Sequence, residues 1–187
     1  MSKMTADQQS TIERAVADIL DAIGEDVHRP GLQETPRRVA QFWREFVDHE
    51  AGSMASFPEA MSDSDLVAVK GMDLWSLCEH HLLPFSVTVS VGYLPVGRVL
   101  GLSKFARIAQ RHAHRLQVQE RMTRAIADDI VEVTGSADVA VVSRGSHSCM
   151  AMRGVRVPAV MHTSVMLGRF RTEAALRAEL LALIGQG

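Results

Sequence analysis

One stretch decides how the rest of this chain is interpreted: Leu77-Cys78-Glu79-His80-His81-Leu82-Leu83-Pro84-Phe85. It places a thiol, a carboxylate and two imidazoles in four consecutive positions, with apolar residues on both sides. The chain has only two cysteines, and the second, Cys149, follows His147 by two residues. The rarest metal-binding side chain in the sequence therefore occurs only beside histidine, and this pairing indicates a chemical site.

Cys78 and His81 have the Cys-x-x-His spacing that allows one tight loop to bind a single ion. Catalytic zinc sites usually have three protein ligands and an open fourth position. Cys149 would complete such a set from a distant part of the chain. Spacing alone favours zinc; a pair of ordinary buried cysteines and a Cys78–Cys149 disulfide are the alternatives, the disulfide being disfavoured in a reducing cytosol.

Composition limits the class of protein. With 187 residues, 47% hydrophobic and 22% charged, the chain is expected to form one soluble globular domain with an appended helical segment. A net charge of -2 argues against general nucleic-acid binding. No apolar run approaches the roughly 20 residues that span a bilayer, so no membrane is expected as a partner. The N-terminus lacks the apolar core of a signal peptide, so we expect a cytoplasmic location.

The N-terminal part reads as helical. Apolar residues recur at helical spacing over about Thr11–Ile23, and Thr35-Pro36 provides an N-cap and a first-turn proline for a second helix. Asp48–Asp65 lacks periodicity and is predicted to be a surface loop. We therefore expect a helical segment over residues 1–60 and a catalytic domain over residues 61–187.

Strand signals dominate the second part, and a pair of helices separates them. The predicted elements, in chain order, are strands at Leu66–Lys70, Met72–Ser76 and Phe85–Val91; helices at Lys104–Arg115, with Ser103 as N-cap, and Gln119–Val133; strands at Val139–Ser143, Cys149–Met152 and Thr163–Leu167; and a last helix capped by Thr172. Strand pairs separated by a helix pair predict an α+β fold with an antiparallel sheet.

His147 is a candidate general acid/base. If the Cys149 segment is a strand, the two side chains point to the same face, and the imidazole lies beside a metal-bound water. The alternative is a hydrogen-bonded structural histidine. That alternative loses weight because His147 is so close in sequence to a candidate ligand.

Two further groups are ambiguous when taken alone. Lys104 and Arg107 follow a predicted helix start, where helix dipole and side-chain charge would favour a phosphate, although most such clusters are solvated surface. Glu120 could accept hydrogen bonds from the donor edge of guanine. A glutamate at a helix start is, however, usually just a favourable partner of the helix dipole.

Longer motifs occur in one order along the chain. They are Cys78–Phe85, Gly92–Pro95, Leu100–Lys104, Arg115–Arg121 and His147–Val155, preceded by Gly24–Asp26, Arg29-x-Gly31-Leu32 and Thr35–Val39. Together they resemble GTP cyclohydrolase I in its zinc-dependent form, from about Ile12 to the C-terminus. The segment Val157–Ser164 departs from that family, whose connection here is usually polar and about one residue longer.

The resemblance implies a tunnelling fold, in which antiparallel sheets of several subunits close into a barrel. It implies a homodecamer of two stacked pentameric rings, with active sites at the subunit interfaces. The implied reaction converts GTP and water into 7,8-dihydroneopterin triphosphate and formate, the first step of folate or tetrahydrobiopterin synthesis.

The resemblance also assigns residues by motif match. The implied roles are zinc binding by Cys78, His81 and Cys149; catalysis by His80, His147 and Ser103; triphosphate binding by Lys104, Arg107 and Arg153; and guanine recognition by Gln119 and Glu120. Two other functions remain open from the sequence. One is a related purine-ring-opening cyclohydrolase with a different product or metal, and the other is a non-catalytic oligomeric binding module with a structural metal.

Overall fold

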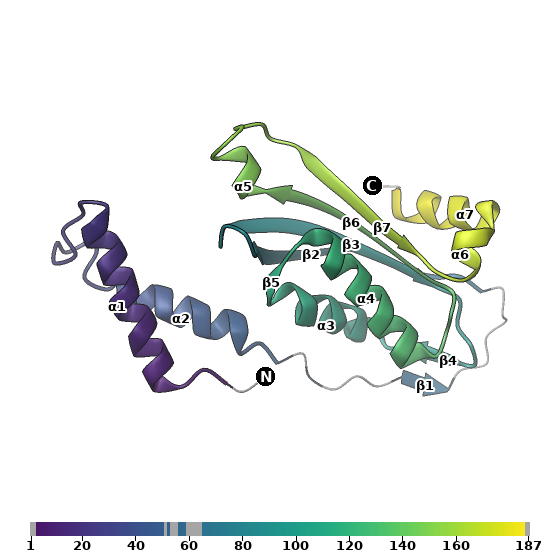
Figure 1. Ribbon diagram of the computed structural model, residues 1–187. Helices are drawn as coiled ribbons and strands as arrows, with labels where there is room; N and C mark the ends of the chain where they lie inside the picture. The colour runs from purple at the N-terminus through teal and green to yellow at the C-terminus, as the bar shows by residue number, and fades with distance from the viewer. Residues whose placement is uncertain (1–2, 51, 53–55, 59–64, 186–187) are drawn as a thin grey trace. The chain divides into compact units, whose positions relative to one another are not determined.

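The structure is a computed structural model that describes residues 3–50, 52, 56–58 and 65–185 (Figure 1). The chain divides into two compact units, Met1–Glu50 and Ala51–Gly187. The predicted boundary between a helical segment and a catalytic domain, at residues 60 and 61, lies outside the described residues. The two units are therefore described one at a time.

Helix α1 of the first unit runs over Ala6–Ala22 and starts before the predicted Thr11. The Thr5 hydroxyl accepts the backbone N–H of Gln8 at 3.2 Å, and the Gln8 side chain accepts the backbone N–H of Thr5 at 2.8 Å. This reciprocal capping box supplies partners for the exposed N–H groups of the first turn. The helix therefore includes polar residues that have none of the apolar periodicity on which the prediction relied.

Helix α2 spans Thr35–Val47 and begins after Glu34, so Thr35 is its first residue and not its N-cap. The rings of Phe42, Trp43 and Phe46 form one cluster, with centroids 5.7 to 6.1 Å apart. Three aromatic side chains of this helix therefore pack on one another.

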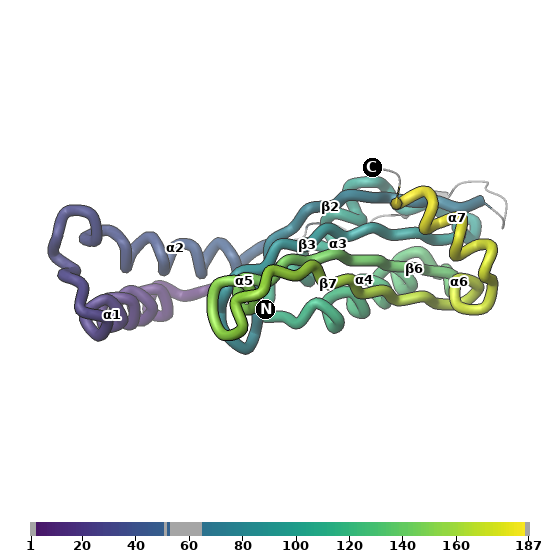
Figure 2. The backbone as a smooth tube through the Cα atoms, turned by 90° about the horizontal axis from the view of Figure 1, so that it is seen from above, coloured from purple at the N-terminus to yellow at the C-terminus, as the bar shows by residue number. Residues whose placement is uncertain are grey.

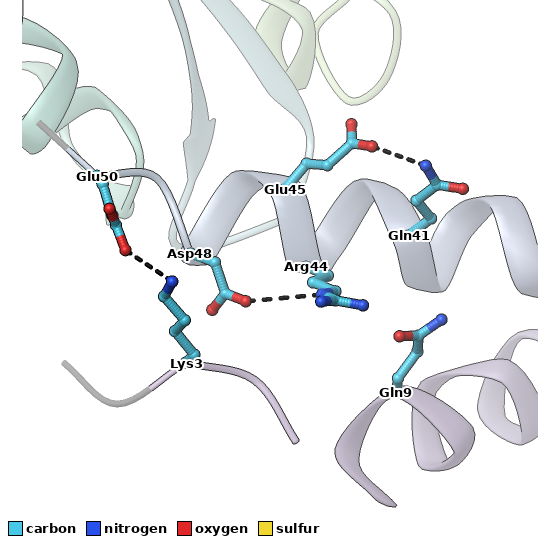
Figure 3. Close-up of a pocket in the computed structure, with 7 residues that line it drawn as sticks. All are labelled: Lys3, Gln9, Gln41, Arg44, Glu45, Asp48 and Glu50. Carbon is cyan, nitrogen blue, oxygen red and sulfur yellow. Dashed lines mark hydrogen bonds and ion pairs between the residues drawn. The ribbon is translucent and has the colours of Figure 1, made fainter. Parts of the chain in front are cut away.

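Figure 3 shows a polar surface hollow in the first unit. Lys3 pairs with Glu50 at 2.8 Å and Arg44 with Asp48 at 3.9 Å along its rim. None of the described residues that line it is a predicted site residue. We assign this hollow no part in the chemistry.

The second unit is built on a curled five-stranded sheet with strand order β5-β2-β3-β6-β7 (Figures 1 and 2). All neighbouring strands are antiparallel except β5, which is parallel to β2. The strands are β2 (Val67–Cys78), β3 (Pro84–Tyr93), β5 (Leu116–Gln117), β6 (Val139–His147) and β7 (Val160–Met166). The predicted α+β class with a mainly antiparallel sheet is confirmed, and the sheet is compatible with a tunnelling fold.

Helices α3 (Leu102–Ala113) and α4 (Gln119–Thr134) lie between the strand pairs in sequence, as predicted, and pack on one face of the sheet. Alternate β3 residues Val87, Val89 and Val91 are buried against them, whereas the intervening polar residues are only partly buried. The period of two seen in the sequence therefore marks the core face correctly.

The opposite face is covered at one end by α6 (Arg169–Thr172) and α7 (Ala174–Gly185). Thr172 ends α6 and does not cap the last helix, contrary to the prediction. No helix of the described residues is long and apolar enough to cross a membrane.

A second, two-stranded sheet pairs β1 (Ser56–Pro58) with β4 (Arg98–Leu100). Part of the predicted loop Asp48–Asp65 is therefore a strand. The β2 strand is continuous, although the sequence predicted two pieces, because Gly71 adopts a left-handed φ of 75° and accommodates a register shift between Val69 and Met72.

The prediction of a strand at Cys149–Met152 was wrong, since Ser148–Ala151 forms the short helix α5. The last β3–β6 pair is Phe85 with His147. The residue after β6, Ser148, would face Pro84, which has no N–H to donate, so the ladder ends at His147. Strand β7 begins at Val160, inside the segment that departs from the family pattern.

We expect Gly168→Ala to destabilise the protein strongly. Gly168 has φ 52° and ψ -130°, and an added Cβ would lie 2.6 Å from the backbone oxygen of Ala137. Strain and overlap together should lower the free energy of unfolding by about 2–4 kcal/mol. Denaturant unfolding at one fixed protein concentration measures this loss.

Gly97→Ala is the matched control, because Gly97 has φ 62° but open space around its Cα. Backbone conformation alone should cost it about 1 kcal/mol. Equal losses in the two variants would show that the packing around Gly168 does not matter.

Candidate metal centre

The Cys-x-x-His loop is a tight turn at the end of β2. Cys78 donates its backbone N–H to the Leu83 oxygen at 2.9 Å, and its own oxygen accepts from His81 at 3.3 Å and Leu82 at 2.9 Å. Leu82 has a φ of 55°, in the left-handed region that residues with a side chain rarely adopt. This turn brings the His81 side chain back toward the Cys78 thiol.

Strand pairing brings the second cysteine to the same place. Because Phe85 at the start of β3 pairs with His147 at the end of β6, α5 begins beside the turn. One ligand atom each from Cys78, His81 and Cys149 lies within 4.8 Å of the others. The structure thus brings the three predicted ligands together across 71 residues (149 − 78). Both cysteines are free thiols, not a disulfide.

The donor set fits zinc. Sγ of Cys78 lies 3.6 Å from Nδ1 of His81. Zn–S and Zn–N bonds of about 2.3 and 2.05 Å at a tetrahedral angle place the two donors about 3.6 Å apart. Cys78 is buried, Cys149 half-buried and His81 exposed, so the group is open on one side. Three ligands and an open side are typical of a catalytic zinc site.

The pKa of the Cys149 thiol would change if a cation were bound. Burial, followed by a hydrogen bond with Cys78, raises the pKa of the Cys149 thiol. Metal binding requires the thiolate, so a bound cation would reverse this shift. At the rim of the site, the Arg153 guanidinium lies 3.1 Å from Nε2 of His81. Arg153 therefore places a positive charge beside the candidate metal-binding group.

His147 is held at the end of β6 by two contacts. Its ring stacks on Phe85 with centroids 4.6 Å apart and planes at 13°, and its Nε2 lies 2.9 Å from Oε1 of Gln119. Burial lowers the pKa of His147, and the nearby Glu120 carboxylate partly opposes this shift. The same-face argument that linked His147 to Cys149 was wrong, because Cys149 lies in a helix. His147 is the last residue of β6, and Cys149 is the second residue of the helix α5 that follows it.

The resemblance gave Glu79 and Arg121 no role, yet they join the turn to the start of α4. The Glu79 carboxylate accepts from both terminal nitrogens of Arg121, at 2.5 and 3.1 Å, and this bond lowers the pKa of Glu79. The Glu79 backbone N–H also donates to the Gln117 oxygen at 3.1 Å. His80 is exposed, with its Nε2 3.7 Å from Glu79. The sequence offered one signal for this contact, namely the charged residue Glu79 inside a candidate metal-binding loop.

Gln119 and Glu120, the first residues of α4, differ in exposure. The Gln119 side chain is buried and its amide bonds within the chain, whereas the Glu120 side chain is exposed. Within one subunit, then, only Glu120 of this pair presents its polar atoms to solvent.

Ser103, Lys104 and Arg107 are not brought to the metal-binding group within one chain. They lie in the first two turns of α3, which follows β4. The other end of α3 is the one near the site, where the Ala113 oxygen accepts from Ser76 at 2.7 Å. A helix of 12 residues spans about 17 Å at 1.5 Å per residue. Gly101 is the N-cap, so Ser103 does not cap the helix as predicted.

Fold and site define an α+β protein with a group of three side chains, Cys78, His81 and Cys149, that could hold a metal ion, and with a histidine, His147, close to it in sequence. Comparison with known proteins narrows this class. The chain belongs to the GTP cyclohydrolase I family, whose model matches residues 12–185.

Curated relatives cover nearly the whole chain. GTP cyclohydrolase 1 of Hyperthermus butylicus is 48% identical over 94% of this chain and 91% of its own length. That of Methylococcus capsulatus is 49% identical over 95% and 98%, and GTP cyclohydrolase 1 1 of Pseudomonas putida is 47% identical over 93% and 94%. A crystal structure of the archaeosine synthase QueF-Like in the apo form overlaps 56% of this chain and 95% of that one at a TM-score of 0.42 and 18% identity, too little to support an argument.

We expect Cys149→Ala to lose zinc, because it removes one of three ligands. His80→Ala is the matched control: its side chain is exposed and is not one of the three clustered ligands. Metal content per chain after dialysis, measured by mass spectrometry, should be near one for the unaltered protein and the control and near zero for Cys149→Ala. Full zinc content in Cys149→Ala would contradict the ligand assignment.

Proposed function

We propose that this chain is a zinc-dependent GTP cyclohydrolase I. It hydrolyses the imidazole ring of the guanine in GTP, releases formate and forms 7,8-dihydroneopterin triphosphate. The observation that carries this proposal is the Cys78–His81–Cys149 group beside His147, in a chain that belongs to this family. Thiolate ligands and a GTP substrate suit a reducing cytoplasm, which we propose as its location.

In the proposed site Cys78 and Cys149 bind zinc as thiolates, and His81 binds it as a neutral imidazole. Zinc, when bound, supplies a Lewis acid that makes water nucleophilic at neutral pH. His147, whose pKa is lowered by burial, exchanges a proton with the guanine nitrogen next to the attacked carbon. His80, exposed on the turn, is the second proton carrier.

Substrate recognition uses the charges around this group. The Glu120 carboxylate lies near His147 and offers two acceptor oxygens to the N–H groups of the guanine edge. The Arg153 guanidinium, beside His81, is placed to bind a phosphate oxygen. The guanine base and the triphosphate of GTP are thereby held on the two sides of the imidazole-ring carbon that water attacks.

Ser103, Lys104 and Arg107 complete the site only if a neighbouring subunit supplies them. We therefore propose an assembly in rings, in line with the homodecamer that the family resemblance implies. In it, Ser103 assists the ribose rearrangement, and the two basic side chains bind the triphosphate beside zinc of another subunit. The distance of the α3 start from the ligands of its own chain supports this arrangement.

The sheet edges also support assembly. Within the described residues, β7 has no neighbour on its outer side, and β5 covers only Leu77 and Cys78 of the long β2. Open edges invite pairing with another chain. Large apolar side chains of this unit are also exposed, namely Trp75, Val155, Val157 and Val160. Sheets that continue from subunit to subunit would cover both features.

The test of function is incubation of the zinc-loaded protein with GTP, with formate, pterin fluorescence and product mass measured in one sample. We expect formate and 7,8-dihydroneopterin triphosphate. His147→Ala should keep its zinc and lose formate release by about 100-fold or more, because general acid–base catalysis contributes about 10²–10⁴-fold.

Two results of this experiment would contradict the proposed function and favour another one. An uncyclised formamide or a cyclic phosphate would identify a related cyclohydrolase that stops at a different product. No turnover by zinc-loaded protein would favour a non-catalytic binding module.

Assembly has its own measurement. Light scattering should give a mass near ten times the 20.5 kDa of one chain. Trp75→Glu should lower that mass, because Trp75 is 67% exposed on β2 and a charge there would be buried at a subunit contact. A monomer for the unaltered protein would overturn the proposed ring.

A further inference from the structure

Gln119 carries a buried amide between α4 and the strands β6 and β7. The side chain is 1% exposed. Its nitrogen lies 3.1 Å from the backbone oxygen of Met161 and 3.3 Å from that of Ser143. Backbone carbonyl oxygens only accept hydrogen bonds, so the donating NH₂ end of this amide must face the two strands. The chemistry of its neighbours thus settles the orientation of the amide.

The oxygen end of the amide faces His147. Oε1 of Gln119 lies 2.9 Å from Nε2 of the imidazole. An amide oxygen cannot donate, so Nε2 must carry the hydrogen of this bond. In the neutral ring the lone pair is then on Nδ1. Stacking on Phe85 fixes the plane of the same ring.

A cluster of two buried hydroxyls and one half-buried hydroxyl holds the amide in place. The hydroxyls of Thr123, Ser143 and Thr163 lie 2.6 to 2.7 Å from one another. Those of Ser143 and Thr163 also lie 3.1 and 3.4 Å from the amide nitrogen of Gln119. A satisfied polar network inside the protein is rigid, because breaking any one bond leaves a buried group without a partner.

Gly145 leaves the space that the amide needs. A Cβ at this position would overlap Oε1 of Gln119 and lie 3.2 Å from the backbone oxygen of Ser86. Strand β6 therefore lacks a side chain at the one position where the Gln119 oxygen passes toward His147. This observation is independent of the hydrogen bonds and points to the same contact.

We propose that Gln119 is a positioning residue, which holds the His147 ring so that Nδ1 is the nitrogen left for proton exchange with the substrate. This inference rests on the proposed function for the role of His147. It differs from the guanine recognition that the family resemblance implies for Gln119. Recognition of the base then falls to Glu120, the exposed neighbour.

Gln119→Met tests this role, since it keeps the length of the side chain and removes the hydrogen bonds at both ends of the amide. We expect kcat to fall by about 10-fold to 100-fold and KM for GTP to stay within about threefold, because no substrate contact is lost. The preference for GTP over inosine triphosphate, which lacks the 2-amino group, should not change. Gln41→Met, an exposed glutamine of α2, is the matched control and should keep full activity.

A direct base contact would behave differently. A raised KM, or a changed preference between the two nucleotides, with kcat unaltered, would overturn the positioning role. Gln119→Asn keeps a buried amide but is one methylene too short to reach both ends, and it serves if the methionine variant does not fold. Gly145→Ala, which leaves Gln119 itself intact, should reproduce the fall in kcat.

A double variant separates the two roles further. In a His147→Ala background, Gln119→Met should cost less than about twofold more, since a positioning residue has nothing left to position. A further loss as large as in the single variant would contradict the proposal.

The crystal structure of Gln119→Met tests the contact without reference to activity. The His147 ring should be turned or displaced, while Cys78, His81 and Cys149 stay in place. An unmoved ring would overturn the inference. If the unaltered protein does not turn over GTP, the proposed function fails, yet this comparison still decides whether Gln119 positions His147.

Discussion

The pairing of β3 with β6, in which Phe85 lies opposite His147, is the contact on which the site depends. It joins the Cys-x-x-His turn before β3 to the helix that follows β6. The pairing ends there because Pro84 cannot donate to the ladder. The chain therefore leaves the sheet after His147, which stacks on Phe85, and Cys149 follows in α5.

Most of this arrangement could be predicted, and the reasons differ between its parts. The core face of β3 follows from strict alternation of apolar and polar residues, and α3 and α4 from helical periodicity. The candidate ligands Cys78, His81 and Cys149, which the fold brings together, could be picked out because cysteine is scarce in this chain. The helix at Cys149 could not be predicted, because Cys, Met and Ala in a short run fit either state, and the end of pairing with Pro84 decides between them. A capping box at Thr5 decides where α1 starts, and the apolar pattern of the sequence does not show this start.

The features that could not be predicted from the sequence also have physical causes. In the sequence Gln119 and Glu120 are neighbours, and nothing distinguishes their exposure. A helix turns about 100° per residue, so Gln119 points into the core and Glu120 points outward. Likewise, the sequence places Ser103 and Lys104 in a motif without showing that α3 carries them away from the ligands of the same chain. A motif carries no information on burial or hydrogen bonding, because these are properties of the fold.

The metal-binding group lies at the end of the sheet, while the packed interior extends from β3 to α3 and α4. Of the three ligands only Cys78 contributes a buried side chain to that interior. Small zinc domains unfold without their metal because the ion takes the place of a core. Here the interior consists of apolar side chains that pack on one another, so we expect the fold not to depend on a bound ion. If zinc is required as we propose, the protein could stay folded without it, and its abundance in a cell need not equal its active fraction.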